Sequence, residues 1–374
     1  MGFWALGLMT GTALDGMIDC ALLRTDGIDI LELGPWCLHP YPDQLRPLLI
    51  EAVSQARDWD FRGPEPEIFA RAERALSLAH AQAVEALLRQ AGLPRQALRL
   101  IGFHGQTVLH RRALAGQIGA TRQLGDGALL AQGTGVDVAF DFRSSDVAQG
   151  GNGAPLAPIY HRALMRFSGL EAPAAALNLG GVANVTYWAG GEDLVALDVG
   201  PANGPVNEWI ERCGLGRFDA DGQLAALGEV HEDRIQAALS HAFFGEPYPK
   251  SLDRYDFNAD LVDGLSPADG AATLTALIGA ALARSLALLP RIPHRLVLSG
   301  GGRKNPQILR AIQERAQVEI ALAEDLGWRG DAIEAEAFAF LAARTALGLP
   351  ISFPATTGAP RPLPGGRIAL AKYG

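Results

Sequence analysis

The stretch Phe140–Pro158 gathers the residue types that reaction centres use. Its sequence, FDFRSSDVAQGGNGAPLAP, places Asp141, Arg143 and Asp146 directly after the β-type residues of Val136–Phe140. The glycines and proline that follow disfavour a regular strand or an interior helix. Carboxylates and a guanidinium in a loop just past a strand end predict a reaction centre of an α/β protein. The alternative, on this pattern alone, is a well-capped surface turn.

A second candidate is the turn Gly11-Thr12-Ala13-Leu14-Asp15-Gly16, which follows the apolar run Phe3–Met9 and precedes Met17 and Ile18. Glycine permits positive φ, and the small residues between the glycines leave backbone N–H groups open to an anion. The Asp15 carboxylate is a candidate ligand for Mg²⁺, directly or through water. Without other evidence, a plain hairpin explains the turn equally well.

The third candidate is the sequence GFHGQT, which follows an expected strand at Leu98–Phe103. The side chains of His104 and Gln106 suit hydrogen bonds to sugar hydroxyls or to an amide. A satisfied structural histidine is the alternative for His104.

The second half of the chain repeats the pattern of the first. An expected strand at Ala174–Leu179 leads into Gly180-Gly181, flanked by Asn178 and Asn184, and a returning strand follows at Val185–Trp188. Leu194–Asp198 is a third strand. Strands joined by a glycine-rich turn thus open both halves, as in a duplicated domain.

A further glycine turn separates the expected strand Arg295–Leu298 from a helix that begins at Pro306. It contains Gly300, Gly301, Gly302 and Asn305. Three glycines before a helix N-terminus allow a flat or anionic ligand to lie against the backbone. Because the chain has neither GxxxxGK[ST] nor GxGxxG, neither a P-loop nor a Rossmann fingerprint explains this turn.

Length and composition indicate a two-lobed α/β protein. A chain of 374 residues exceeds one ordinary core, so we expect lobes at residues 1–165 and 166–374. A net charge of −9 disfavours nucleic acid or a membrane as a partner. Three cysteines without CxxC favour a cytoplasmic location. The first fifteen residues lack a basic region and are not expected to be a secretory signal.

Apolar residues at three-to-four spacing predict the helices. The expected ranges are Pro42–Arg57, Pro66–Ala91, Asp126–Gly133, Tyr160–Arg166, His231–Phe244, Pro267–Leu289 and Asp331–Leu347. Ser266 is an expected N-cap. The tail from Ile351, rich in Pro, Thr and Gly, is expected to wrap the surface.

Taken together, these patterns resemble the actin, hexokinase and heat-shock-protein-70 superfamily, an actin-like/RNase H-like ATPase fold with two lobes and a central cleft. The closer resemblance is to the anhydro-N-acetylmuramic acid kinase family of bacterial peptidoglycan recycling. It covers nearly the whole chain, in order, through GLMTGTALDG, GFHGQTVLH, FDFRSSDVAQGGNGAPLAP, LNLGGVANVT, LDVGPANGPVNEW, LVLSGGGRKNP and GDAIEAEAFAFLA.

The resemblance implies a role for each site residue. Asp146 matches the catalytic aspartate, and Asp15 the acid beside Mg²⁺. Glu334 would face the sugar, with His104, Gln106 and Arg143 as further candidates. ATP would contact Gly11, Thr12, Ala13, Leu14, Asp15, Gly16, Met17, Ile18, Asn178, Gly180, Gly181, Asn184, Gly300, Gly301, Gly302 and Asn305. The implied reaction is the hydrolytic opening and phosphorylation of a small anhydro amino sugar. Whether the protein forms a homodimer stays open.

Three departures separate this chain from the family pattern. Ala13 stands where the family usually has serine, an extra residue precedes Asp19, and Lys250–Arg254 reads KSLDR instead of KSTGR. Two other functions stay open: an ordinary sugar or carboxylate kinase of the same fold, and a nucleotide-driven clamp of the actin or heat-shock type.

Overall fold

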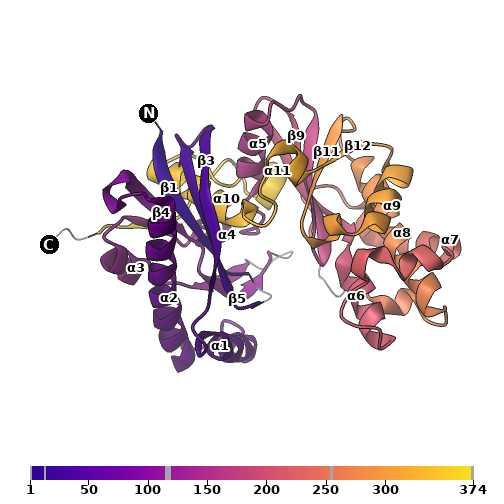
Figure 1. The fold of residues 1–374 in the computed structure, drawn as a ribbon, viewed down its shortest axis with the longest axis horizontal. Coiled ribbons are helices and arrows are strands. Elements are labelled where there is room, and N and C mark those ends of the chain that lie inside the picture. The colour runs from indigo at the N-terminus through magenta and orange to yellow at the C-terminus, as the bar shows by residue number, and fades with distance from the viewer. Residues whose placement is uncertain (1, 12–13, 114–118, 253–255, 372–374) are drawn as a thin grey trace. The chain divides into compact units, whose positions relative to one another are not determined.

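The computed structural model describes residues 2–11, 14–113, 119–252 and 256–371. The chain forms two compact units (Figure 1). Unit 1 comprises Met1–Phe167 and Ala332–Gly374, and unit 2 comprises Ser168–Asp331. Each unit is built on its own β-sheet.

The sheet of unit 1 has the order β13-β7-β4-β1-β2-β3. Strands β1, β2 and β3 pair antiparallel, whereas β1, β4 and β7 pair parallel. The bounds are β1 Phe3–Met9, β2 Met17–Thr25, β3 Ile30–Pro40, β4 Leu98–Phe103, β7 Val138–Phe140 and β13 Arg367–Ala369. A separate ribbon of β5 (Gln106–Arg111) and β6 (Ala120–Leu124), which the sequence patterns did not predict, follows β4.

The sheet of unit 2 repeats this topology. Its order is β10-β9-β8-β11-β12, again with three antiparallel strands followed by parallel ones. The bounds are β8 Ala174–Leu179, β9 Val182–Gly190, β10 Asp193–Pro201, β11 Arg295–Ser299 and β12 Glu319–Leu322. The predicted α/β class and the predicted repeat of the first half are therefore confirmed.

The predicted helices lie near their expected ranges, although the one expected at His231–Phe244 ends at Leu239. The helices at Ser144–Ala148, Asn203–Arg212 and Pro354–Thr357 were not predicted. In unit 1 the helices are α1 Leu45–Trp59, α2 Glu67–Ala91, α3 Gly127–Thr134, α4 Ser144–Ala148, α5 Pro158–Phe167, α10 Ile333–Ala346 and α11 Pro354–Thr357. In unit 2 they are α6 Asn203–Arg212, α7 Glu232–Leu239, α8 Pro267–Leu286 and α9 Pro306–Ala316. Ser266 caps α8, as predicted, by accepting from the backbone N–H of Asp269.

Helix α10 packs very closely on the sheet of unit 1. Gly7 of β1 and Gly102 of β4 are neighbours in the parallel register and both contact this helix. A Cβ on Gly7 would lie 1.7 Å from the carbonyl oxygen of Ala335, and one on Gly102 would lie 2.0 Å from that of Phe338. Leu6, on the opposite face of β1, packs into the core formed with α1 and α2. The two glycines thus let the backbone of α10 touch the sheet.

This packing explains a difference from the expected division at residue 165. The sequence-based division assigns the end of the chain to the second lobe, but Ala332–Gly374 clusters with the first unit. Helix α10 contacts β1, β2 and β4, and β13 pairs with β7 at the sheet edge. The chain therefore returns to unit 1 after completing unit 2.

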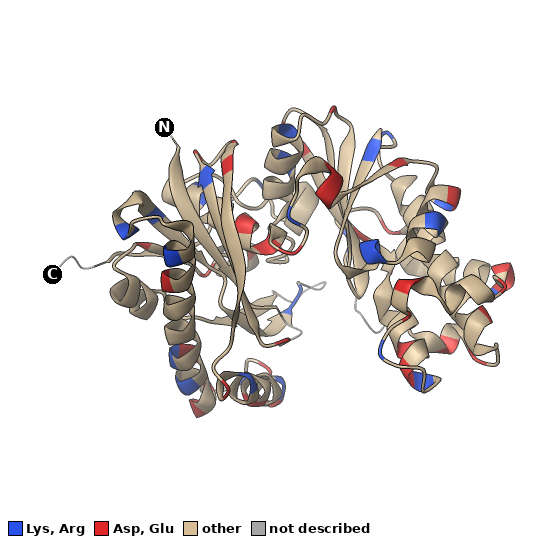
Figure 2. Cartoon of the chain, in the orientation of Figure 1, with Lys and Arg blue, Asp and Glu red and all other residues tan. Residues whose placement is uncertain are grey.

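Acidic and basic residues alternate along the same elements, for example on α2 (Figure 2). No helix in the described part of the chain is long and apolar enough to span a membrane.

The glycine contact gives a stability prediction. Gly102→Ala should lower the free energy of unfolding by about 1–3 kcal/mol or more, because the new methyl group meets backbone that cannot turn aside. Gly133→Ala, at an exposed position of α3, is the matched control and should stabilise by up to roughly 1 kcal/mol. Urea denaturation measures both; equal effects at the two positions would contradict the close packing.

Candidate active site

Asp146 lies on the short helix α4, which occupies part of the stretch predicted as a loop. Its side chain is only 2% exposed. The Oδ2 atom accepts a hydrogen bond from the backbone N–H of Gly153 at 2.6 Å, and Oδ1 accepts one from the Thr357 hydroxyl at 2.7 Å. A Cβ on Gly151 would lie 2.2 Å from Oδ2, so only a glycine lets the backbone approach the carboxylate this closely.

Arg143 and His104 form a fixed pair beside Asp146. The Nε and one terminal nitrogen of Arg143 lie 3.2 and 3.0 Å from Nε2 of His104, and the other terminal nitrogen donates to the Gly153 carbonyl oxygen at 2.7 Å. Nδ1 of His104 lies 2.7 Å from the carbonyl oxygen of Gly105, which can only accept. The ring proton is therefore on Nδ1, and Nε2 accepts from Arg143.

Burial sets the protonation of this pair. Burial, together with the Arg143 cation, holds the pKa of His104 well below its usual value, which agrees with a neutral ring. Burial also lowers the pKa of Arg143 to about 10, against the opposing effect of Glu334 and Asp146. Arg143 thus stays cationic at neutral pH.

Glu334 joins the group from the first turn of α10. Solvent reaches its side chain, but protein surrounds it closely enough for desolvation to raise the pKa of Glu334 above the usual 4.5, with Arg143 acting in the opposite direction. The ring of Phe338, one turn along the helix, lies 4.5 Å from the ring of His104, centroid to centroid. The predicted residues Asp146, Arg143, His104 and Glu334 are therefore brought together within unit 1.

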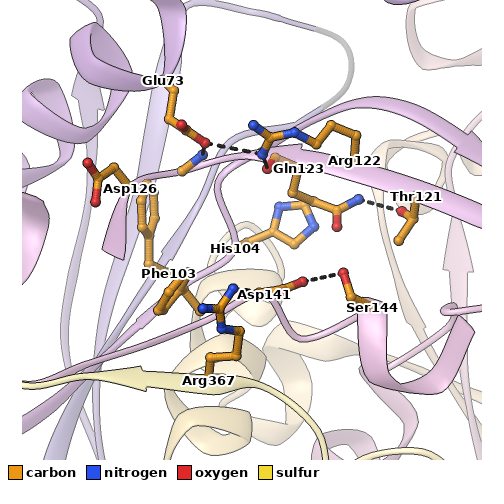
Figure 3. Close-up of a pocket in the computed structure, with 12 residues that line it drawn as sticks. Glu73, Phe103, His104, Thr121, Arg122, Gln123, Asp126, Asp141, Ser144 and Arg367 are labelled. Carbon is orange, nitrogen blue, oxygen red and sulfur yellow. Dashed lines mark hydrogen bonds and ion pairs between the residues drawn. The ribbon is translucent and has the colours of Figure 1, made fainter. Parts of the chain in front are cut away.

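A polar pocket of about 340 Å³ adjoins His104 within unit 1 (Figure 3). The Ser144 hydroxyl donates to the Asp141 carboxylate, and the Gln123 amide donates to the Thr121 hydroxyl at 2.7 Å. The lining comprises Glu73, Phe103, His104, Thr121, Arg122, Gln123, Gly125, Asp126, Phe140, Asp141, Ser144 and Arg367. Hydroxyl, amide and carboxylate groups of this kind suit a polyhydroxylated ligand.

Gln106 faces a different neighbour. Its amide nitrogen lies 3.2 Å from the Thr107 carbonyl oxygen and 3.5 Å from that of Gly11, in the first glycine turn. Its side-chain oxygen is buried and has no hydrogen-bond partner among the described residues. The structure thus places Gln106 beside the turn at Gly11.

The first glycine turn is held from two sides. The Arg46 guanidinium donates to the Leu14 carbonyl oxygen at 2.6 Å, and the backbone N–H of Tyr41 donates to that of Gly16 at 2.7 Å. Leu14 and Gly16 both have positive φ. Two of the predicted ATP residues, Thr12 and Ala13, lie outside the described residues.

The turn offers one acid for a metal ion. Asp15 is exposed, and its Oδ1 accepts from the backbone N–H of Met17 at 3.1 Å, which orients the carboxylate. No group of three acids, histidines or cysteines among the described residues could hold a metal. An exposed, oriented carboxylate is the kind of group that completes a Mg²⁺ shell made mostly of nucleotide oxygens and water. The role of Asp15 as a metal ligand stays a prediction.

In unit 2 the predicted glycine turns lie side by side. Asn178 and Asn184 are paired across β8 and β9. A Cβ on Gly300, which has positive φ, would lie 2.3 Å from the side-chain oxygen of Asn178. The carbonyl oxygens of Gly180 and Gly181 accept backbone N–H groups from the start of α6. Gly301 and Gly302 begin a 3₁₀ turn beside these residues.

The side chain of Asn305 already makes hydrogen bonds within the protein. Its side-chain oxygen accepts from the backbone N–H groups of Gln307 and Ile308, which makes it the N-cap of α9. Its role near a nucleotide stays a prediction.

Sequence reasoning missed two residues of these sites. Asn203 donates to the Leu179 carbonyl oxygen at 2.9 Å and borders Gly302, so it lies between the glycine turns of unit 2. Asn203 lies in LDVGPANGPVNEW, but no residue pattern there assigns it a role. Thr357, the partner of Asp146, comes from the tail that was expected to wrap the surface. No spacing rule joins residues so distant in the sequence.

The raised pKa of Glu334 predicts a pH-dependent stability. As the pH rises above about 4.5, the unfolded chain loses the Glu334 proton before the folded chain does, so Glu334 lowers folding stability at neutral pH but not in acid. Glu334→Gln should therefore raise the melting temperature near pH 7 and change it little near about pH 4. Glu211→Gln, an exposed change on α6, is the control. A gain of equal size at both pH values would refute this explanation.

Solved structures similar to this chain share little of its sequence. One is a glucokinase of the ROK family from Streptomyces griseus, solved with glucose and AMPPNP. It is 13% identical to this chain with a TM-score of 0.39, and the match covers 91% of this chain and 99% of the glucokinase chain. Component A of the (R)-2-hydroxyglutaryl-CoA dehydratase of Acidaminococcus fermentans is also 13% identical, with a TM-score of 0.47, covering 92% of this chain and 99% of its own.

Curated relatives are far more similar. Anhydro-N-acetylmuramic acid kinases from Brucella anthropi and Rhizobium rhizogenes are 54% and 55% identical to this chain. The alignments cover 98% of this chain in both cases, and 98% and 99% of the two relatives. The family model for anhydro-N-acetylmuramic acid kinase matches residues 4–370. This chain therefore belongs to the anhydro-N-acetylmuramic acid kinase family, a family of kinases.

Proposed function

We propose that this protein uses ATP to phosphorylate 1,6-anhydro-N-acetylmuramic acid and hydrolyses the anhydro bond in the same reaction. The product would be N-acetylmuramic acid 6-phosphate, formed during peptidoglycan recycling. Family membership supports the substrate class. The observation that carries the hydrolytic step is the buried Asp146 carboxylate, held at both oxygens beside Arg143.

A 1,6-anhydro sugar has no free hydroxyl at C6, so ring opening has to supply the acceptor. The Asp146 carboxylate takes a proton from water as the water oxygen bonds to C1 and the C1–O6 bond breaks. O6 then bonds to the γ-phosphorus of ATP, and the bond from that phosphorus to the bridging oxygen breaks to release ADP. A positioned base contributes about 10²–10⁴-fold to such a step.

The residues around Asp146 would bind the sugar. Arg143 is cationic, and solvent reaches the side chain of Glu334. The two charged groups interact electrostatically. Arg143 suits an anionic or hydroxyl group of the sugar, and the carboxylate of Glu334 suits a hydroxyl or amide donor. Neutral His104 orients Arg143. The buried oxygen of Gln106 would need a small movement before it could accept from the ligand.

The glycine turns would bind the nucleotide. In unit 1, the proposal assigns the phosphates of ATP to Gly11–Ile18, with Asp15 holding Mg²⁺. In unit 2 it assigns further nucleotide contacts to Asn178, Gly180, Gly181, Asn184, Gly300, Gly301, Gly302 and Asn305. The bound ion would neutralise charge on the transferring phosphoryl group. Absence of nucleic-acid and membrane partners, a homodimer and a cytoplasmic location stay predictions.

Asp146→Asn should lower kcat by about 10²–10⁴-fold, because the amide cannot take the proton from water. ATP binding and folding should change little, since the amide oxygen can still accept from one donor. Asp26→Asn, in the turn between β2 and β3, is the control, because an asparagine oxygen can accept from Ile28 and Asp29 as the native carboxylate does. Near-normal turnover of Asp146→Asn would reject the base assignment.

The proposed reaction itself is tested in ¹⁸O-labelled water with the anhydro sugar and ATP. The label should enter the anomeric carbon and not the phosphate, read early and against a product-only control for exchange at C1. Phosphorylated sugar without early label would indicate an ordinary sugar kinase. Label in the phosphate would indicate an ATPase, and absence of ADP formation with this sugar, against a panel of plain sugars, would reject the substrate.

A further inference from the structure

The tail residue Thr357 contacts the carboxylate of Asp146 directly. Both side chains are buried, with exposures of 0% and 2%. The Thr357 hydroxyl lies 2.7 Å from Oδ1 of Asp146 and 3.4 Å from the carbonyl oxygen of Phe353. A hydroxyl has one proton, and the shorter contact goes to the charged acceptor, so Thr357 donates to Asp146.

The backbone of the same residue holds the loop after Asp146. The carbonyl oxygen of Thr357 accepts from the backbone N–H of Asn152 at 2.7 Å. Asn152 is next to Gly153, whose backbone N–H donates to the other carboxylate oxygen. One tail residue therefore fixes one oxygen of Asp146 directly and the donor of the other oxygen through the loop.

The tail is anchored well enough to act as a fixed support. Ile351 and Leu363 are buried, and Ser352 and Leu363 form an antiparallel bridge that closes the segment around α11. Beyond it, the Thr345 hydroxyl of α10 donates to the Gly365 carbonyl oxygen at 2.8 Å. Helix α11 runs from Pro354 to Thr357, and Gly358 follows it in the left-handed conformation. The position of Thr357 is thus set by contacts on both sides of it.

We propose that Thr357 is a positioning residue, which holds the plane of the Asp146 carboxylate so that a free lone pair faces the reacting water. This inference rests on the proposed role of Asp146 as the base. A carboxylate turns readily about its Cβ–Cγ bond, and two donors, one on each oxygen, fix that rotation. Each oxygen keeps a second lone pair for the water proton. Without the hydroxyl, only the Gly153 N–H would restrain the carboxylate.

The test is Thr357→Val, which keeps the shape of the side chain and removes the donor. We expect kcat to fall about 10- to 100-fold, as for a misplaced catalytic group, with the KM for ATP within about twofold of the native value. Thr357→Ser restores the donor and should return kcat to within about threefold. Thr357→Ala is the second variant if the valine variant does not fold.

The neighbouring residue provides the matched control. Thr356 is also buried, but its hydroxyl lies 3.1 Å from the Phe353 carbonyl oxygen and 3.2 Å from the Phe353 backbone nitrogen and does not contact Asp146. Thr356→Val should lower stability while leaving kcat near the native value. Equal losses of kcat at the two positions would show that Thr357 acts only through the stability of the tail.

A double-mutant cycle with Asp146→Asn separates this inference from the proposed function. If Thr357 acts through Asp146, Thr357→Val should lower the residual rate of Asp146→Asn by less than about twofold. Full additivity, or native turnover in both folded variants without the hydroxyl, would overturn the inference. Failure of the native protein to turn over the anhydro sugar would instead reject the proposed function.

Discussion

The contact between the backbone of α10 and a pair of adjacent glycines organises unit 1. Because neither Gly7 nor Gly102 has a Cβ, the carbonyl groups of the helix meet the two central parallel strands directly. This contact sets how closely the helix approaches the sheet. Glu334, at the start of α10, is thereby placed near Arg143, which follows the end of β7. A side chain on either glycine would move the helix and the acid together.

Local residue patterns predicted most of the strands and helices, because the spacing of apolar residues along the chain favours one or the other. Alternating or continuous apolar runs gave β1 (Phe3–Met9), β4 (Leu98–Phe103) and β8 (Ala174–Leu179) with the bounds that the structure has. Helices such as α2 (Glu67–Ala91) follow from three-to-four spacing. The ribbon of β5 (Gln106–Arg111) and β6 was missed because most of its residues are polar and only partly buried, so they show no clear alternation of apolar and polar residues.

The residues of the candidate site could be named from the sequence, but their contacts could not. The motifs named Asp146, Arg143, His104 and Glu334, yet only the resemblance to a family joined Glu334 to the others. The hydrogen bond from Thr357 to Asp146 links residues 211 positions apart in the sequence. Such contacts depend on the three-dimensional course of the tail, which is determined by burial and sheet pairing rather than by any local period.

Arg143 lies near Asp146, but the hydrogen bonds of its guanidinium go to other groups. Its guanidinium donates to the Gly153 carbonyl oxygen and to neutral His104, whose proton is held on the other ring nitrogen by Gly105. A bidentate ion pair with Asp146 would instead stabilise the charged carboxylate and make it a poorer proton acceptor. With the guanidinium engaged by neutral acceptors, Asp146 is held by an N–H group and a hydroxyl. In the proposed mechanism, the neutral histidine thus keeps the Arg143 guanidinium from pairing with the Asp146 carboxylate through hydrogen bonds.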